Sequence, residues 1–177
     1  MNPQLPSREQ TIGILREKNC PPPVINHCIA VADYALETAR RLQGKGFKID
    51  LALIEAGALL HDIGRSRTHS VDHSLVGAQI IQKLGLPKSL VNIIKRHVGA
   101  GITSDEAERL GWPKDNYIPQ TLEEKVVCYA DKRIGNDGVV PIETEIERLQ
   151  KDGFGAAAER VRRLHVEITS LLGETCD

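Results

Sequence analysis

LALIEAGALLHDIG, residues 51–64, is the stretch that decides the fold class. Up to Leu60 its residues are apolar on nearly every side of the helix that they would form, and Asp50 before them is a candidate N-cap. A helix that is apolar on nearly all sides belongs in the interior of a protein. We therefore expect residues 51–63 to form a central helix that ends at Gly64 and is covered by other helices.

The sequence on both sides of this stretch has a helical pattern. Apolar residues recur at steps of three and four from Val24 to Leu42, as on one face of a helix, and Gly44 follows as a stop signal. Because strand alternation and strand–helix–strand spacing are missing, the prediction is an all-α, compact helical bundle in one domain, residues 1–177, with a core of 24–135. Further helices are expected at 7–19, 72–84, 89–97, 142–151 and 155–172, and after the capping boxes Thr103–Glu106 and Thr121–Glu124.

Length and composition fit one soluble domain. Of the 177 residues, 41% are hydrophobic and 3% aromatic, so Leu, Ile, Val and Ala must build the core, which favours close-packed helices. The formal net charge of −1 argues against a nucleic-acid partner. No apolar run approaches the roughly 20 residues that span a bilayer, and the start MNPQLPSREQ lacks the apolar core of a signal peptide. We expect a cytoplasmic protein without a membrane partner; the sequence carries no signal for its oligomeric state.

Histidines and aspartates recur within or beside the expected helices, and several have apolar neighbours, as in ALLHDIG and VVCYADK. An imidazole or carboxylate inside an apolar helix is costly unless it is paired or coordinates an ion. Two explanations are open: separate core hydrogen bonds, the usual state of a lone histidine, or convergence on one metal centre. Six such residues on five expected helices favour the metal centre: His27, His61, Asp62, His73, His97 and Asp131.

The ligand types narrow the choice of ion. Imidazole together with carboxylate suits Mn, Fe, Ni, Co or Zn, whereas Mg prefers oxygen ligands alone. Adjacent residues on a helix, such as His61 and Asp62, point about 100° apart, and an ion beside the helix can be reached by both. Since a helical bundle can gather ligands from facing helices, we expect one or two divalent metal ions in its interior.

LLHDIG at 59–64 resembles the signature of the HD-domain phosphohydrolase superfamily. That family has a helical fold and is named for its His-Asp doublet. Its basic pattern, H…HD…D, is matched in order and approximate spacing by His27, His61-Asp62 and Asp131. The resemblance therefore implies a helical, metal-dependent phosphohydrolase.

A dinuclear branch of that family, the cyclic-dinucleotide phosphodiesterases called HD-GYP, adds two histidines between the doublet and the last aspartate. His73 and His97 stand in that interval, and the resemblance spans roughly residues 24–135. The chain more closely resembles a compact, stand-alone HDIG group, because His97 is single and no Gly-Tyr-Pro triplet follows it.

The resemblance also implies a role for each matched residue. A first ion would have four ligands: His27, His61, Asp62 and Asp131. Asp62 would bridge to a second ion, held by His73 and His97, about 3.5–4 Å away. A water between the ions would lose a proton easily and attack phosphorus, while the ions neutralise the phosphate and the leaving oxygen.

Basic residues and a further histidine flank these positions. Arg65 and Arg67 either complement the C-terminal end of the helix dipole or hold a phosphate oxygen. Related HDIGK proteins carry a lysine where Arg65 stands, so Arg65 is our candidate substrate ligand. His69 lies in a polar loop and either faces water or approaches the site as a proton donor. Of four more basic residues, most are expected to be solvated and one to face the site: Lys95, Arg96, Lys132 and Arg133.

Other conspicuous residues are expected to be structural. His165 is assigned to a solvated helix face, and the only Trp, Trp112, is favoured as a packing anchor over a platform for a base. The cysteines form no C-x-x-C pair, so they are expected to be reduced and to act as small apolar residues and one tail thiol: Cys20, Cys28, Cys128 and Cys176.

The sequence thus predicts a metal-dependent phosphohydrolase whose catalytic residues are Asp62, Arg65 and His69. Its expected partner is a small phosphomonoester or phosphodiester, with a nucleotide favoured. The alternative is a metal-binding regulatory or ligand-binding module without turnover. The presence of all six candidate metal ligands argues against a degenerate site.

Overall fold

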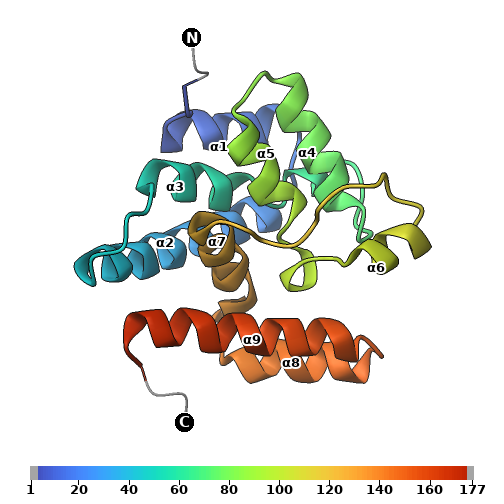
Figure 1. Cartoon of the computed structure of the whole chain (residues 1–177). Helices are drawn as coiled ribbons and strands as arrows, with labels where there is room; N and C mark the ends of the chain where they lie inside the picture. The colour runs from blue at the N-terminus through green and yellow to red at the C-terminus, as the bar shows by residue number, and fades with distance from the viewer. Residues whose placement is uncertain (1–3, 175–177) are drawn as a thin grey trace.

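The computed structural model describes residues 4–174, and these are almost wholly helical (Figure 1). The all-α prediction is confirmed. Two-residue strands form one short antiparallel hairpin, which the sequence analysis did not predict, β1 (Ile134–Gly135) with β2 (Gly138–Val139). The helices of the described residues are α1 (Arg8–Glu17), α2 (Pro22–Gly44), α3 (Leu51–Leu60), η1 (Ile63–Ser66), α4 (His73–Lys83), α5 (Lys88–Lys95), η2 (Val98–Ala100), α6 (Ser104–Arg109), α7 (Leu122–Arg133), α8 (Ile142–Lys151) and α9 (Gly155–Leu172).

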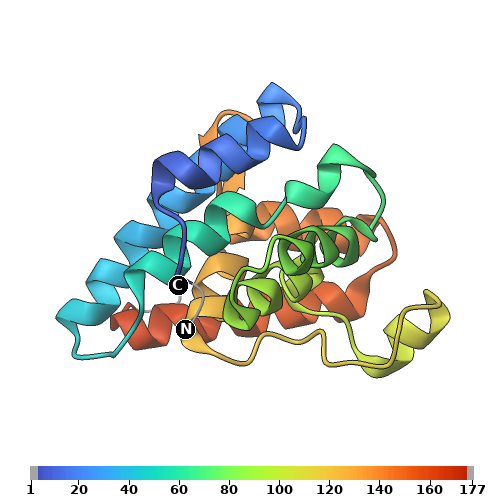
Figure 2. The same cartoon turned by 90° about the horizontal axis from the view of Figure 1, so that it is seen from above.

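The centre of the molecule is formed by α2, α3 and α7. Helix α3 packs against α2, α7, α1 and α5, and it runs between α1 on one side and α4 and α5 on the other in Figure 2. Its apolar residues from Ile54 to Leu60 are largely buried, as predicted for a central helix. Antiparallel α8 and α9 form a lower layer, in which α9 packs against α7 and η2 (Figure 1).

Helix α3 ends at Leu60, earlier than the predicted end at residue 63. His61 still has helical angles, φ −54° and ψ −37°, but Asp62 departs to φ −100° and ψ 13°. Gly64 explains the change, because a Cβ at this position would lie 1.8 Å from the carbonyl oxygen of His73. The chain crosses the start of α4 at this point, and the doublet lies at a helix end rather than inside a helix.

Asp72 precedes α4, but its side chain makes no capping hydrogen bond. Its Oδ1 instead accepts a hydrogen bond from Trp112 Nε1 at 2.6 Å. Trp112 is buried beside Tyr117 in a small apolar cluster, so it is the packing anchor that the sequence favoured.

Three of the four cysteines lie in the described residues, and Cys20, Cys28 and Cys128 are buried as predicted. Cys176 lies outside the described residues. Burial raises the pKa of the Cys20 and Cys128 thiols to about 11, so both remain protonated at neutral pH.

The solvated position predicted for His165 is wrong. Its ring is half-buried, with Nδ1 3.2 Å from the hydroxyl oxygen of Tyr129. The contact forms because α9 packs across α7, and burial together with the nearby Arg133 charge lowers the pKa of His165. None of the described helices has the length and apolar character that crossing a bilayer requires.

Candidate metal centre

The six predicted ligand side chains converge from five elements of the fold. They come from α2, the end of α3, the start of α4, the residue directly before η2, and α7. All six are buried or half-buried. The cluster consists of His27, His61, Asp62, His73, His97 and Asp131.

One half of the cluster is centred on Asp131. Its Oδ1 lies 3.0 Å from Nε2 of His27 and 3.2 Å from Nε2 of His61. The His61 side chain is fully buried, whereas 27% of the His27 side chain is exposed. Two imidazoles and a carboxylate therefore direct donor atoms toward one point, and His27 is the most exposed of the three.

The other half is centred on Asp62. Its Oδ1 lies 3.1 Å from Nε2 of His73 and 3.5 Å from Nε2 of His97. Its second oxygen, Oδ2, lies 3.8 Å from Nε2 of His61, which belongs to the first half. Asp62 therefore lies close to histidines of both halves.

Local hydrogen bonds fix the ring orientation of three histidines. Nδ1 of His61, His73 and His97 lies in each case 2.7 Å from the carbonyl oxygen of the residue three positions earlier. Because a carbonyl oxygen only accepts, Nδ1 of each ring carries the proton and donates it. Nε2 then offers a lone pair to the cluster, which is the tautomer that a metal ligand needs.

These tautomers leave the centre short of positive charge. Nε2 of His73 and Nε2 of His97 lie 3.1 Å apart, with a lone pair on each. Nε2 of His61 is buried and has no hydrogen-bond partner in the described part of the chain. A buried acceptor without a partner costs about 1–3 kcal/mol, and a divalent cation would satisfy several of these atoms together. The donor set therefore fits a transition-metal ion in each half.

The ionisation of the cluster shows its demand for positive charge: without a cation, the two carboxylates draw a second proton to Nε2 of His61, and a metal ion would displace that proton. Burial opposes a charged His61, but the carboxylates of Asp62 and Asp131 outweigh it and hold the pKa of His61 well above its usual value. The pKa of each carboxyl lies far below its usual range despite burial, because charged and hydrogen-bonding neighbours stabilise the anion. Burial lowers the pKa of His97 to about 4, so this ring is neutral at pH 7.

Each carboxylate also has a partner from a basic side chain. Arg65 Nε donates to Oδ2 of Asp62 at 2.7 Å, and Lys132 forms an ion pair with Oδ2 of Asp131. Lys132 is buried, and its Nζ also donates to the carbonyl oxygen of His97 at 3.1 Å. Burial opposes its charge, but Asp131 outweighs burial and raises the pKa of Lys132. The sequence analysis expected one of four flanking basic residues to face the site, and Lys132 is that residue.

The remaining predicted site residues lie at the edge of the cluster. The Arg65 side chain is 31% exposed, so it reaches both Asp62 and the solvent. His69 is exposed in the loop before α4, and no hydrogen bond or ion pair of the described residues joins it to the cluster. Arg67 is exposed as well.

The family model of the HD domain matches residues 24–134, which include the whole cluster. The chain belongs to the HD-domain family. Its fold is also that of a solved member, the HD domain of the L. monocytogenes phosphodiesterase PgpH in complex with cyclic-di-AMP. The TM-score is 0.56 at 17% identity, over 92% of this chain and 99% of that domain.

Proteins with similar sequences come from archaea and bacteria. An uncharacterised protein of Methanocaldococcus jannaschii is 43% identical over 93% of this chain and 98% of its own length. A tRNA (cytidine(56)-2'-O)-methyltransferase of Picrophilus torridus is 36% identical over 98% of this chain but 49% of its own length. A ribonuclease Y of Acidothermus cellulolyticus is 36% identical over 80% of this chain and 26% of its own length. The chain thus spans about half of that methyltransferase and a smaller part of the ribonuclease. The family and its nuclease member support a hydrolase in general.

Proposed function

We propose that this protein is a metal-dependent phosphohydrolase that cleaves a phosphodiester of a nucleotide. The observation that carries the proposal is the convergence of three histidine Nε2 atoms on the carboxylates of Asp62 and Asp131. Such a set has affinity for divalent cations and little other use in a protein interior. When bound, the ions would activate water at neutral pH and stabilise the charge of the phosphate and the leaving oxygen.

The protein supplies position and charge around that chemistry. His27, His61 and Asp131 would hold one ion, His73 and His97 the other, and Asp62 both. Buried Lys132 fixes the outer oxygen of Asp131, so this carboxylate keeps Oδ1 directed toward the imidazoles.

Two residues at the edge of the centre would act on the substrate. Arg65 contacts Asp62 through Nε, and its two NH2 groups are suited to hold a phosphate oxygen at the partly exposed edge of the site. His69 lies in the loop that joins η1 to α4 and would deliver a proton to the leaving oxygen.

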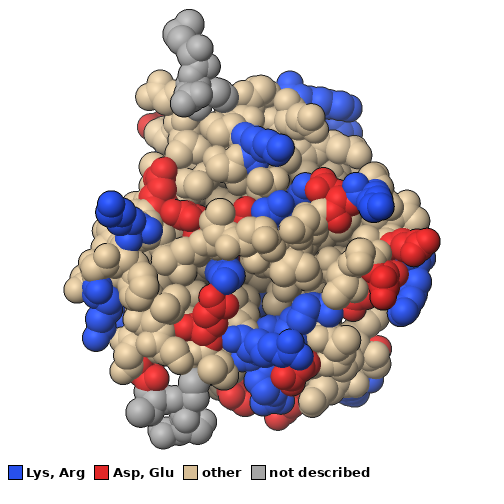
Figure 3. Space-filling model, viewed as in Figure 1, with Lys and Arg blue, Asp and Glu red and all other residues tan. Residues whose placement is uncertain are grey.

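The diester is favoured over the monoester by the relatives. The ribonuclease Y acts, by its name, on RNA, and PgpH is named a phosphodiesterase and is seen with cyclic-di-AMP. On the face seen in Figure 3, basic and acidic side chains are interspersed, and the formal net charge is −1. A mixed surface gives weak non-specific attraction for a long polyanion, so a short or cyclic nucleotide diester fits better than long RNA.

The test is a hydrolysis screen with protein reconstituted separately with Mn, Fe, Ni, Co and Zn. The substrates are a cyclic dinucleotide, a cyclic mononucleotide, a short single-stranded RNA and a nucleoside monophosphate. We expect diester cleavage by the wild type and a loss of about 100-fold or more in Asp62→Asn, which keeps the shape of the side chain but removes its charge.

Three outcomes decide between the proposal and its alternative. Cleavage of the monophosphate alone would replace the diester with a monoester. Nucleotide binding by the metal-loaded protein without turnover on any substrate would establish the ligand-binding module instead. Equal rates for the wild type and Asp62→Asn would assign the activity to a contaminant and contradict the proposal.

A further inference from the structure

The chain turns sharply after His97 through backbone conformations that residues with side chains rarely adopt. Gly99, Ala100 and Gly101 have φ values of +56°, +56° and +101°. Ala100 is buried, although its Cβ is disfavoured in the left-handed region by contact with the following carbonyl oxygen. Conformations of this kind persist where the surrounding structure holds them.

Arg160 of α9 holds the far end of this turn. Its Nε donates to the carbonyl oxygen of Gly101 at 3.1 Å, and its Nη2 donates to both carboxylate oxygens of Glu106 at 3.0 and 2.9 Å. Glu106 is fixed in turn, because it forms a reciprocal capping box with Thr103 at the start of α6. The exposed fractions of the Arg160 and Glu106 side chains are 16% and 28%, so solvent screens this ion pair only in part.

Helix α7 holds the near end. The carbonyl oxygen of His97 accepts hydrogen bonds from Lys132 Nζ and from Cys128 Sγ, each at 3.1 Å. The turn itself packs on α9, where a Cβ at Gly99 would lie in ordinary contact with Ala157. Helix α7 therefore holds the carbonyl oxygen of His97, and α9 holds the turn that follows it.

We propose that Arg160 is a positioning residue for His97 and sets the affinity of the ion that His73, His97 and Asp62 would hold. A metal ligand must be placed to within about 0.2 Å, and residues that orient ligands from outside typically change metal affinity 10–100-fold. Arg160 lies outside residues 24–134, which the HD family model matches, so this contribution comes from the C-terminal layer of the molecule. The inference rests on the proposed function in taking that second ion as bound.

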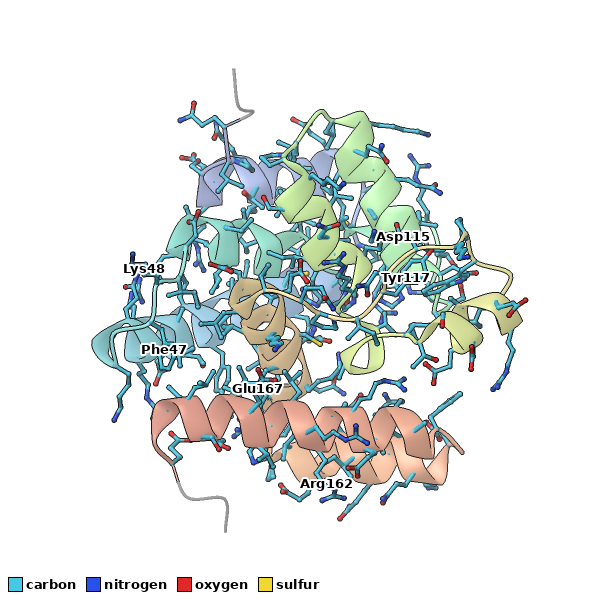
Figure 4. The ribbon with its side chains drawn as sticks, in the orientation of Figure 1. Phe47, Lys48, Asp115, Tyr117, Arg162 and Glu167 are labelled. Carbon is cyan, nitrogen blue, oxygen red and sulfur yellow. The ribbon has the colours of Figure 1, made fainter. Side chains whose placement is uncertain are left out.

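The experiment is a titration of metal-free protein with Mn²⁺, which gives the number of ions and the affinity of each. Arg160→Met removes every hydrogen bond of the guanidinium, and Arg160→Lys can keep one of them. Arg162→Met is the matched control, because Arg162 lies on the same helix, 50% exposed at the lower edge of the molecule, and pairs with Glu159 (Figure 4). Circular dichroism of each variant checks that the helices remain.

We expect Arg160→Met to weaken the second ion about 10-fold or more and to leave the first unchanged, with Arg160→Lys in between and Arg162→Met like the wild type. If Arg160→Met does not fold, Glu106→Gln serves in its place, because it removes the charge that holds Arg160. The proposal then predicts that Glu106→Gln weakens the second ion and leaves the affinity of the first unchanged. Wild-type affinities in the folded variant, or equal weakening of both ions, would overturn the proposal. A wild-type protein that binds one ion would also overturn it, while leaving hydrolysis at a single ion intact.

Discussion

At the scale of single residues, short-range hydrogen bonds orient three of the four histidine rings in the centre. The carbonyl oxygen that orients His61, His73 or His97 belongs to the residue three positions earlier. Since Nδ1 of each of these rings is used locally, Nε2 is the nitrogen that faces the cluster. Because the candidate ligands fall into an Asp131 half and an Asp62 half, single substitutions in the two halves should have different effects.

His73 belongs to the Asp62 half, with Nε2 3.1 Å from Oδ1 of Asp62. We expect His73→Ala to keep one metal ion and to lose most of the turnover, because the remaining ion would have to activate water and stabilise the leaving oxygen without the help of a second. Elemental analysis and initial rates check this. His61→Ala is the comparison, since His61 contacts both halves and its loss should strip the metal and the activity together. Equal ion counts and equal rates in wild type and His73→Ala would make His73 a structural residue.

Arg65 contacts Asp62 at the partly exposed edge of the centre. Hydrogen bonds to charged groups contribute about 1.5–3 kcal/mol, so Arg65→Ala should raise KM roughly 10-fold or more, with a smaller effect on kcat. Steady-state kinetics on the best substrate of the screen measures both constants. The matched control is Arg67→Ala, an exposed arginine two residues away, which should behave like the wild type. A fall in kcat at constant KM would instead indicate a contact made only in the transition state.

The convergence of the six candidate ligands was predictable from the sequence, whereas the residues that support them were harder to identify. A histidine or aspartate among apolar neighbours stands out in the sequence, and its order along the chain matched a known pattern. Lys132 was one of four basic candidates, because its role depends on the carbonyl oxygen of His97, which only the folded chain brings near. Arg160 lies among other arginines on an amphipathic helix, and no sequence signal distinguishes it from Arg162.

At the scale of elements, the centre is set by where helices end. The sequence located the major helices well, because capping residues and apolar periodicity act locally. It placed the end of α3 too late, because the close approach of Gly64 to α4 is a tertiary contact. It also missed the β1–β2 hairpin, since strands of two residues are too short to show alternation.

Gly64 is the element-scale prediction. A Cβ at Gly64 would lie 1.8 Å from the carbonyl oxygen of His73 and 2.8 Å from the backbone nitrogen of Gly77, so Gly64→Ala must separate η1 from α4. We expect the free energy of unfolding to fall by about 3 kcal/mol and the ion of the Asp62 half to weaken. Denaturant unfolding and Mn²⁺ titration measure the two effects. The control is Gly13→Ala in α1, which has open space around the new methyl group and should be neutral or stabilising by about 0.5–1 kcal/mol. Similar stability of Gly64→Ala and the wild type would contradict this account of the crossing.

At the scale of the whole molecule, the centre brings together side chains from five parts of the fold. Its candidate ligands come from α2, the end of α3, the start of α4, the residue directly before η2, and α7, and α9 packs beneath them on α7 and η2. An ion bound there would therefore crosslink the upper helices to the central ones. Stability of the whole chain should depend on metal.

Chelation tests that dependence. A ligand at about 100 times its dissociation constant stabilises the native state by about 2.7 kcal/mol, which for a chain of this size corresponds to roughly 5–10 °C in Tm. Calorimetry should show a drop of that order after verified metal removal, restored by adding the metal back. His61→Ala provides the control, because a variant that has lost its metal should show little response to the chelator. An unchanged melting curve for the metal-free wild type would contradict a central site.

The central claim is that metal ions lie among the convergent Nε2 and carboxylate oxygen atoms. Anomalous diffraction from crystals of Mn²⁺-loaded protein locates such ions directly. The account predicts one peak within bonding distance of His27, His61 and Asp131, and a second beside His73 and His97, with Asp62 between the two. Crystals of metal-loaded protein with no peak in the cluster, or with peaks only at surface carboxylates, would contradict it.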